Sequence, residues 1–390
     1  MLIISFDAVG DREFEQLMEY PAFSVFSGQA AVYRDVPTLF VSNTYPIHTS
    51  IATGVMPVKH GIIANTKPFP AKFPIWNVNE SGIRAETIWQ AAAKRGIETA
   101  AVFWPVTALS KTIRYNIPEV LARPGKSQII TSLKAGSKRL QLEMLIRHGK
   151  ILSGINQPNI DNFATACMTD ILRKYKPGLA LIHLTAYDSL CHKHGKGSPV
   201  LKTAYESLDK NLARLLEAAG ESEDVIIFSD HSQINLHTEI LPNEILERAG
   251  LISREGDDWR LGESGCYIEC CSGCAFFHAG QLPECSIEEI RINIEQSEGF
   301  RRFLTSEEMH NAGYQNAAFG FCAETGYCYE AFLNGNKADH GYPPDTPDYN
   351  VFYMVRGAGL PKGSVTRGGS LLDIAPLVAS RLGLVTVKYD

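Results

Sequence analysis

The chain has 390 residues, of which 45% are hydrophobic and 21% are charged, a composition typical of a globular protein with a large core. The net charge of -6 shows no basic excess of the kind that nucleic-acid-binding proteins carry, so we expect no stable nucleic-acid partner. No apolar run approaches the roughly 20 residues that span a bilayer, and no signal peptide is visible, so we expect no membrane partner. The nine cysteines then favour reduced thiols and a cytoplasmic location.

Short apolar runs alternate with helical stretches along most of the chain. The predicted strands, in chain order, are Leu2–Phe6, Thr99–Phe103, Leu179–Leu184, Val225–Ser229 and Val351–Val355. The predicted helices are Ala85–Arg95, Asn162–Lys174, Pro199–Ala219 and Leu371–Leu382. Near-continuous apolar strands suit positions that are buried on both faces of a sheet. This pattern predicts an α/β fold with a mostly parallel central sheet flanked by helices.

Two segments interrupt the alternation. Residues 106–160 are basic with helical tendency, and we interpret them as a minor insertion. Residues 251–335 carry most of the cysteines, with clusters of Gly, Glu and aromatic residues, and we interpret them as an inserted cap subdomain. The strand–helix order resumes afterwards, which favours insertion over a separate terminal domain. The predicted core therefore comprises residues 1–250 and 336–390.

Acidic residues and a histidine follow three of the predicted strands. Asp7 follows the first strand, Asp188 comes shortly after the third, and Asp230 and His231 follow the fourth. Ligands of open α/β sheets bind beyond the carboxyl ends of the strands, so these side chains are expected to share one pocket. Clustered carboxylates repel one another unless cations compensate them. Mixed oxygen and nitrogen ligation suits zinc, manganese or iron.

Each of these signals is weak alone. Asp188 and His192 stand four residues apart, which on a helical turn places both on one face, but such a pair alone more often marks a solvated turn. Asp230 could cap a helix, and His340 could lie in a surface turn. Their combination in one chain is far less probable by chance than any single motif.

Thr44 stands at the start of a predicted helix that has Pro46 in its first turn. The free N–H groups and the dipole at a helix amino terminus favour an anion such as phosphate. A hydroxyl at this point, if bound to a metal, can act as a nucleophile. The simpler alternative makes Thr44 only the cap of its helix.

Taken together, these residues resemble the alkaline phosphatase superfamily, and within it the nucleotide pyrophosphatase/phosphodiesterase family, also called type I phosphodiesterases. The resemblance runs from the first strand to about residue 345 through an ordered set of motifs, which comprises Thr44-Tyr-Pro-Ile-His48, Thr53-Gly-Val-Met-Pro57, His60-Gly-Ile-Ile-Ala-Asn65, Pro74-Ile-Trp76, Trp104-Pro105, Asp188…His192-Lys-His-Gly195, Ser229-Asp230-His231 and His340-Gly-Tyr342. The departures, at Ile47, Tyr187 and Ser232-Gln233, remove none of the ligands that the family pattern implies.

The resemblance implies an alkaline-phosphatase-like fold and two divalent metal ions, usually Zn²⁺, with Mn²⁺ or Fe as alternatives. One ion would be held by Asp188, His192 and His340, and the other by Asp7, Asp230, His231 and the Thr44 hydroxyl. Thr44 would attack phosphorus and form a covalent intermediate. Two further roles are implied, with Asn65 donating to a non-bridging phosphate oxygen and Tyr45 stacking on a base. Core packing is an equally plausible role for Tyr45.

The cysteines at positions 266, 270, 271 and 274 include a Cys-x-x-Cys pair, but no second pair at zinc-ribbon spacing accompanies them. We favour buried small apolar residues over a further metal site. The sequence has no P-loop, dinucleotide-binding or nucleophile-elbow motif.

The sequence therefore predicts a two-metal hydrolase that cleaves phosphodiester or pyrophosphate bonds of small nucleotide-type substrates. The alternatives on the same metal core are a phosphonate hydrolase, a phosphomonoesterase and a phosphosugar mutase. An alternative of another class is a non-catalytic metal-dependent binding protein.

Overall fold

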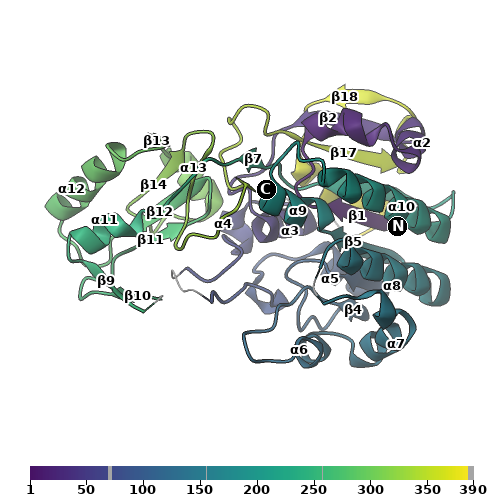
Figure 1. Ribbon diagram of the computed structural model, residues 1–390. Coiled ribbons are helices and arrows are strands. Elements are labelled where there is room, and N and C mark those ends of the chain that lie inside the picture. Colours follow the sequence, from purple (N-terminus) through teal and green to yellow (C-terminus); the bar gives the residue numbers. More distant parts are fainter. Residues whose placement is uncertain (69–72, 155, 257, 385–390) are drawn as a thin grey trace.

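A computed structural model describes residues 1–68, 73–154, 156–256 and 258–384 of the chain. Its centre is an eight-stranded sheet, seen right of centre in Figure 1. In spatial order the strands are β18 (Val365–Arg367), β2 (Ala31–Val36), β17 (Val351–Arg356), β6 (Val225–Ser229), β1 (Leu2–Phe6), β5 (Leu179–Leu184), β3 (Thr99–Val102) and β4 (Tyr115–Ile117). All neighbouring strands are parallel except at β17, which runs antiparallel to both β2 and β6. The mostly parallel α/β sheet predicted from the sequence is confirmed.

Helices cover both faces of this sheet, and each face has its own apolar cluster. One face packs against α1 (Phe14–Leu17), α2 (Pro21–Gln29), α7 (Lys138–His148), α8 (Asn159–Tyr175), α9 (Ala186–His194) and α10 (Leu201–Ala219). The other face packs against α3 (Thr44–Thr53), α5 (Ile88–Lys94) and α14 (Ile374–Leu382). Alternate residues of β1 enter these two clusters, which is why the strand is apolar apart from Ser5.

A smaller subdomain, built on an antiparallel sheet, lies at the left of Figure 1 and corresponds to the predicted cap. Its antiparallel sheet has the order β11 (Tyr267–Cys270), β12 (Cys274–His278), β14 (Phe319–Ala323) and β13 (Phe300–Phe303). Around this sheet are α11 (Asn243–Arg248), α12 (Glu284–Glu295), α13 (Ser306–Ala312) and the hairpin β9 (Ile252–Glu255) to β10 (Asp258–Leu261). The cap has a separate apolar cluster, so its fold does not depend on burial against the central sheet alone.

Two short ribbons connect the cap to the core. They pair β7 (Ile234–Asn235) with β16 (Ala338–Asp339), and β8 (Thr238–Ile240) with β15 (Tyr327–Tyr329). The remaining elements are α4 (Pro57–His60), α6 (Gln128–Ala135) and four short 3₁₀ turns at Asp11–Glu13, Glu80–Gly82, Gly149–Ile151 and Leu371–Asp373.

The predicted domain boundaries stay a prediction, and two observations bear on them. The segment 106–160 is not wholly peripheral, because its strand β4 forms one edge of the central sheet. Helix α11, which precedes residue 251, contributes Leu246 to the apolar cluster of the cap. All nine cysteines are free. In the cluster at 266–274, Cys266, Cys271 and Cys274 are buried, as the apolar interpretation expects, whereas Cys270 is half-buried.

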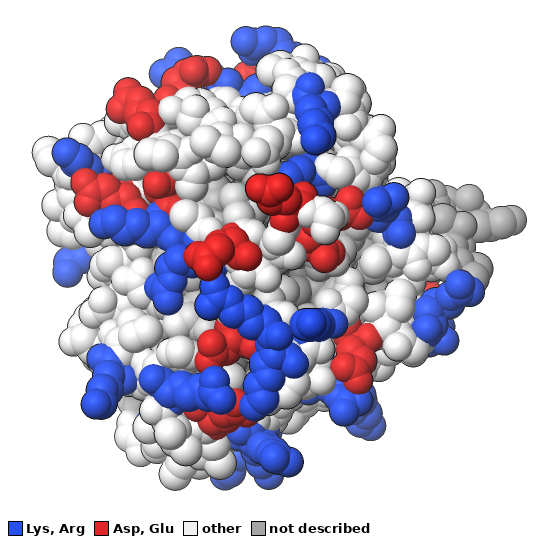
Figure 2. Space-filling model, turned by 90° about the vertical axis from the view of Figure 1, so that its right-hand side faces the viewer, with Lys and Arg blue, Asp and Glu red and all other residues white. Residues whose placement is uncertain are grey.

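Charges of both signs are mixed over the surface on the side away from the cap, as Figure 2 shows. Among the described residues, no helix is long and apolar enough to cross a membrane.

Candidate active site

Three parallel strands bring acidic side chains to one edge of the central sheet. The register pairs the last residue of β1 with the last residues of β5 and β6, so the three strands end at the same level. Asp7 follows β1, Asp230 follows β6, and Asp188 lies in the first turn of α9 just beyond β5. The edge predicted from the sequence is therefore assembled by strand register.

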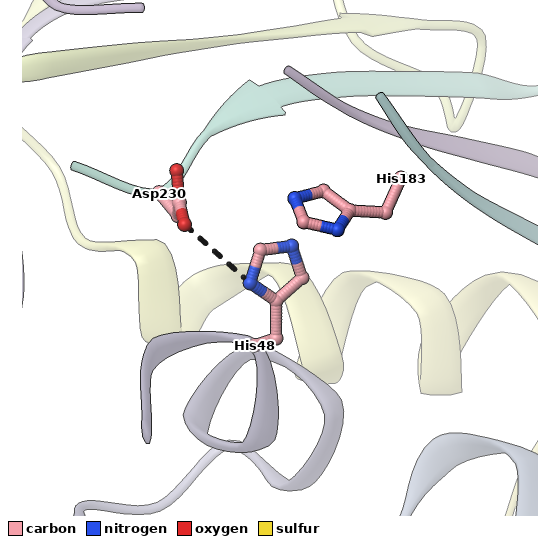
Figure 3. Close-up of side chains that lie close together, drawn as sticks. All are labelled: His48, His183 and Asp230. Carbon is pink, nitrogen blue, oxygen red and sulfur yellow. Dashed lines mark ion pairs between the residues drawn. The ribbon is translucent and has the colours of Figure 1, made fainter. Parts of the chain in front are cut away.

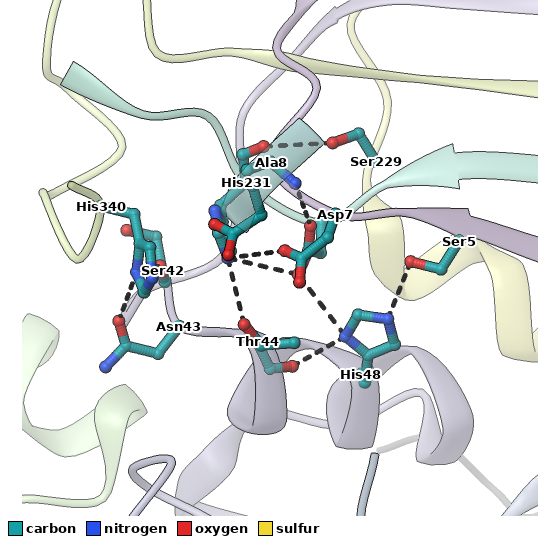
Figure 4. Close-up of polar contacts among 12 residues, drawn as sticks. Ser5, Asp7, Ala8, Ser42, Asn43, Thr44, His48, Ser229, His231 and His340 are labelled. Carbon is teal, nitrogen blue, oxygen red and sulfur yellow. Dashed lines mark hydrogen bonds and ion pairs between the residues drawn. The ribbon is translucent and has the colours of Figure 1, made fainter. Parts of the chain in front are cut away.

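Thr44 faces this edge from the amino terminus of α3 (Figure 4). It is the first residue of the helix, and the side chain of the N-cap residue Asn43 makes no capping hydrogen bond. The Tyr45 N–H donates to Asn65 Oδ1 at 2.9 Å, whereas the Thr44 N–H has no acceptor among the described residues. The Thr44 hydroxyl lies 3.3 Å from His231 Nε2. A free N–H and a hydroxyl at one helix end are suited to hold and attack a phosphoryl group.

Asp7, Asp230 and His231 form one candidate metal-binding group, in which one ligand atom from each residue lies within 4.8 Å of the others. His231 Nε2 is 3.4 Å from Asp7 Oδ1 and 3.4 Å from Asp230 Oδ2. Both of these carboxylate oxygens are buried and accept no hydrogen bond from the described residues. Burying two carboxylates side by side, each with an oxygen that accepts no hydrogen bond, is costly, so the group fits a bound cation.

The ionisation of this group supports that conclusion. Burial and the neighbouring Asp230 and Asp188 carboxylates raise the pKa of Asp7 well above its usual value. Burial also raises the pKa of Asp230 to about 6 and lowers the pKa of His231 to about 4. A neutral imidazole is the form that ligates a metal ion, and positive charge would favour the two carboxylates in their ionised form.

Asp188, His192 and His340 lie beside the first group. Asp188 Oδ1 is 3.2 Å from His192 Nε2, one helical turn along α9, as their spacing predicts. His340 follows β16, and its ring centroid is 4.1 Å from that of His231 and 5.3 Å from that of His192. Asp188 and His340 share a candidate metal group with His231, while His192 and His340 share another with Asp339. The structure thus brings together every predicted ligand, while their division between two ions stays a prediction.

Sequence reasoning missed several side chains that hold these ligands. Gln233 Nε2 donates to Asp188 Oδ1 at 2.5 Å, and Asn43 Oδ1 lies 2.9 Å from His340 Nδ1. Asp339 Oδ2 lies 3.7 Å from His192 Nδ1. Asp339 directly precedes His340, which is the one signal that could have drawn attention to it.

Two buried histidines, His48 and His183, lie near Asp230, one of the proposed ligands (Figure 3). His48, which the sequence analysis placed in a motif without a role, donates from Nδ1 to the Thr44 carbonyl at 2.8 Å and lies 3.5 Å from Asp230 Oδ2. His183, the last residue but one of β5, places Nε2 3.2 Å from Asp7 Oδ2. Burial opposes its charge, but the neighbouring Asp7 raises the pKa of His183 well above its usual value. His183 carries no motif, so only the structure identifies it.

Asn65 and Tyr45 lie close to Thr44. Asn65 Oδ1 accepts the Tyr45 N–H, and the Asn65 amide NH₂ has no acceptor among the described residues, so it can donate as the predicted phosphate contact requires. The ring of Tyr45 is 3% exposed and its centroid is 5.5 Å from that of Trp76. Burial and the contact with Trp76 fit core packing, and stacking on a base stays a prediction.

Comparison with known proteins identifies the family to which the chain belongs. The family model described as type I phosphodiesterase / nucleotide pyrophosphatase matches residues 1–299. The chain belongs to this family. The resemblance inferred from the motifs is thus confirmed, and so is the function class that it implied. The chain is a hydrolase of phosphodiester or pyrophosphate bonds in nucleotides.

Curated relatives in this family include the bis(5'-adenosyl)-triphosphatase ENPP4 of *Pongo abelii*, which is 22% identical over 98% of this chain and 78% of that protein. Human ectonucleotide pyrophosphatase/phosphodiesterase family member 5 is 22% identical over 62% of this chain and 46% of that protein. Among solved structures, human ENPP5 superposes with a TM-score of 0.72 at 16% identity, covering 100% of this chain and 96% of that one. An inactive threonine-to-alanine variant of murine ENPP5, solved in complex with AMP, gives a TM-score of 0.71.

These structural neighbours confirm the alkaline-phosphatase-like architecture. Members of the family depend on metal ions, and the groups of buried carboxylates and imidazoles described above are suited to bind them. The relatives are named as ectonucleotide enzymes, which does not support the cytoplasmic location expected from the cysteines, and that expectation stays a prediction.

Proposed function

We propose that the chain hydrolyses phosphodiesters through a covalent threonine intermediate, with Thr44 as nucleophile and two divalent metal ions at the edge of the sheet. The observation that carries the proposal is the position of the Thr44 hydroxyl. It lies at a helix amino terminus and 3.3 Å from His231 Nε2, beside the group that this histidine forms with Asp7 and Asp230.

The two proposed ligand sets keep the division inferred from the family motifs. Asp7, Asp230, His231 and the Thr44 hydroxyl would hold one ion, and Asp188, His192 and His340 the other. When bound, such a pair lowers the pKa of a coordinated hydroxyl and neutralises charge on the leaving oxygen. Zn²⁺ fits the mixed oxygen and nitrogen donors, and Mn²⁺ and Fe fit the same set.

The protein groups can then carry the reaction in two displacements. Thr44 Oγ1 forms a bond to phosphorus while the bond to the leaving oxygen breaks, and the leaving alcohol takes up a proton. Water then attacks the same phosphorus, the bond to Thr44 Oγ1 breaks, and the hydroxyl regains its proton. The Thr44 N–H and the Asn65 amide donate to the non-bridging oxygens in both steps, where negative charge is greatest in the transition state.

The charge of the site favours a diester or pyrophosphate over a monoester. Among the described residues, the ion pairs of Asp7, Asp188 and Asp230 are all with histidines, and none is with Lys or Arg. A monoester dianion would therefore approach three carboxylates without a Lys or Arg side chain paired to them, whereas a diester carries one charge less. The murine neighbour solved with AMP supports a nucleotide as one substituent.

Thr44→Ala tests the nucleophile. We expect a loss of turnover of roughly 10³-fold or more, because no other hydroxyl takes its place, with metal content by mass spectrometry near that of the wild type. Thr44→Ser is the matched control and should keep measurable turnover. The nucleophile assignment is wrong if Thr44→Ala keeps more than a tenth of the wild-type kcat.

Comparative kinetics tests the substrate class. We expect higher kcat/KM on bis-p-nitrophenyl phosphate than on p-nitrophenyl phosphate, and a strong preference for the monoester would favour the phosphomonoesterase alternative. Phenylphosphonate esters and phosphosugars test the remaining alternatives. If the metal-loaded wild type turns over none of these compounds, the non-catalytic binding protein is favoured.

We also propose a cytoplasmic location, supported only by nine cysteines that form no disulfide. Fractionation of the native source tests it, and recovery of the protein outside the cytoplasm would refute it.

A further inference from the structure

His183 is a buried titratable residue beside the metal edge that the proposed reaction does not use. It is 0% exposed and stands in β5, whose other residues are Leu, Ala and Ile. Burying an imidazole in such a strand is costly unless the ring has a polar partner. The register pairs His183 with Ser5, and the ladder continues to Asp7, whose N–H donates to the Leu184 carbonyl. Because side chains alternate along a strand, His183 and Asp7 point to the same face of the sheet.

The two oxygens of the Asp7 carboxylate face different partners. Oδ2 lies 3.2 Å from His183 Nε2, and Oδ1 lies 3.4 Å from His231 Nε2. Among the described residues, no other N–H or O–H group donates to either oxygen. His183 is therefore the side chain that sets the rotation of this carboxylate.

The second carboxylate of the same candidate metal group, Asp230, is held in a comparable way. Its Oδ1 accepts the Ala8 N–H at 3.1 Å, and its Oδ2 lies 3.4 Å from His231 Nε2. Each carboxylate thus keeps one oxygen toward His231 and the other toward a nitrogen of the protein. For Asp230 that nitrogen belongs to the backbone, whereas for Asp7 it belongs to His183.

The ring of His183 is itself fixed in place. Its centroid is 4.4 Å from that of His48, whose Nε2 lies 2.8 Å from Ser5 Oγ (Figures 3 and 4). The other ring nitrogen, Nδ1, is 3.8 Å from Glu119 Oε2, which is too long for a hydrogen bond. The Nε2 side of the ring is therefore the side that acts on a neighbour.

A ligand role for His183 is the alternative, because ligand atoms of His48, His183 and Asp230 also lie within 4.8 Å of one another. His48 cannot complete such a site, since its Nδ1 donates to the Thr44 carbonyl and its Nε2 is engaged with Ser5. Two ligands remain, which is fewer than a zinc site uses.

We propose that His183 is a positioning residue, whose Nε2–H donates to Asp7 Oδ2 and thereby holds Asp7 Oδ1 toward the ion shared with His231. A hydrogen bond to one oxygen of a carboxylate limits its rotation and leaves the other oxygen for the metal. This inference rests on the proposed function, because that ion is the one that the Thr44 hydroxyl would coordinate.

Two amide substitutions separate the two ring nitrogens. The amide nitrogen of Gln is as many bonds from Cβ as Nε2 of His, and that of Asn as many as Nδ1. In zinc titration against a competing chelator, His183→Asn should weaken one site by about 10- to 100-fold and leave the other within about threefold. His183→Gln keeps a donor at the Nε2 position and should bind zinc at both sites within about threefold of the wild type.

Turnover gives a second readout, because Asp7 and Thr44 belong to the same proposed ion. At limiting zinc, His183→Asn should lower kcat on bis-p-nitrophenyl phosphate by about tenfold or more, with KM within about twofold, and added zinc should restore part of kcat. His183→Gln should keep most of the wild-type kcat. A purely structural role predicts equal losses, since both variants lose the ring that packs against His48.

His60→Gln is the matched control. His60 is equally buried, and its ring nitrogens contact Ser50 Oγ and the Ile62 N–H, which belong to no predicted ligand. This variant should keep both zinc affinities within about twofold of the wild type, even where it lowers the melting temperature.

Equal zinc affinities of His183→Asn and His183→Gln would overturn the inference, and so would a third zinc ion that both variants lose. The wild type gives a measurement that needs no variant to fold. Nitrogen NMR of the histidine-labelled, zinc-loaded protein should show a proton on the Nε2 that packs beside the His48 ring, and a zinc-bound Nε2 there would contradict the role. Zinc titration does not depend on turnover, so normal zinc binding without turnover of any ester contradicts the proposed function alone.

Discussion

Asn65 is the residue whose contribution can be separated most cleanly from metal binding. Its Oδ1 is fixed by the Tyr45 N–H, and it belongs to none of the candidate metal groups. Asn65→Ala should lower kcat by about 10²- to 10³-fold, as loss of one oxyanion donor does elsewhere, with little change in metal content. Steady-state kinetics on bis-p-nitrophenyl phosphate measures the effect. A kcat within threefold of wild type would show that Asn65 does not contact the reacting phosphate.

Single residues were predictable from sequence where the chemistry itself demands a residue type. The carboxylates and imidazoles of the candidate metal groups stand at strand ends and at helical spacing, so Asp7, Asp188 and His192 could be proposed as ligands from their positions. Gln233 could not, because its partner Asp188 is 45 residues away and an amide has many structural uses. His183 lies inside an apolar strand, where nothing in the alternation of residues reveals that it faces Asp7.

Helix α9 carries Asp188 and His192, and its start is fixed by a buried residue of another helix. The N-cap residue of α9, Thr185, makes no side-chain capping hydrogen bond. Instead, Asp161 of α8 accepts the Thr185 N–H at 3.1 Å and the Ala186 N–H at 2.8 Å, which satisfies two N–H groups at the helix start. Asp161→Asn replaces one acceptor oxygen by a donor. It should lower the free energy of unfolding by about 2 kcal/mol and weaken metal binding, since the first turn of α9 holds Asp188.

Asp209→Asn is the matched control for this prediction. Asp209 of α10 accepts the Ala22 and Phe23 N–H groups at the start of α2, a helix that carries no predicted ligand. This variant should cost about 1 kcal/mol and leave metal affinity unchanged. Urea unfolding and zinc titration with a competing chelator give the two readouts. Equal loss of metal affinity in both variants would mean that general destabilisation, not the start of α9, is responsible.

The strands whose bounds were predicted correctly are those that are buried along their whole length. The apolar runs of β1, β5 and β6 are buried throughout, and their predicted bounds match the structure. Strand β2 was missed because Arg34 and Asp35 interrupt its apolar pattern near the edge of the sheet. Strand β4 has three residues, too few for a periodicity. The antiparallel direction of β17 could not be predicted, because it depends on how the chain connects distant strands and the residues of one strand carry no such information.

At the scale of the whole molecule, folding places buried carboxylates and imidazoles of distant segments in one site. His340 is 298 residues from Ser42, whose carbonyl lies 3.2 Å from its Nδ1. The cap and core are joined next to this histidine, because the Gly273 N–H donates to the His340 carbonyl. Metal binding is therefore expected to stabilise the complete fold, including the attachment of the cap, and not the metal edge alone.

The stabilisation by metal should depend on pH, and the pKa shifts give its sign. Burial raises the pKa of Asp230 to about 6, so the metal-free native state holds this proton more tightly than the unfolded chain, whose Asp has a pKa near 3.9. Its contribution to stability is complete below about pH 4 and is lost as the pH rises to about 6. Metal binding needs the ionised carboxylate and reverses this loss at higher pH.

The protonation of His192 also makes metal binding stronger as the pH rises. Burial opposes its charge, but Asp188 and Asp339 raise the pKa of His192 to about 10, and the ring must lose its proton to bind an ion. His231 and His340, with pKa values of about 4, are already neutral at pH 5 and do not compete. The difference in melting temperature between zinc-loaded and chelator-treated protein should therefore grow from pH 5 to pH 7.5, with apparent zinc affinity rising at least about tenfold. Asp230→Asn should reduce part of this increase in zinc affinity with pH. A zinc-induced shift in melting temperature that is constant from pH 5 to pH 7.5 would contradict the assignment of these residues as ligands.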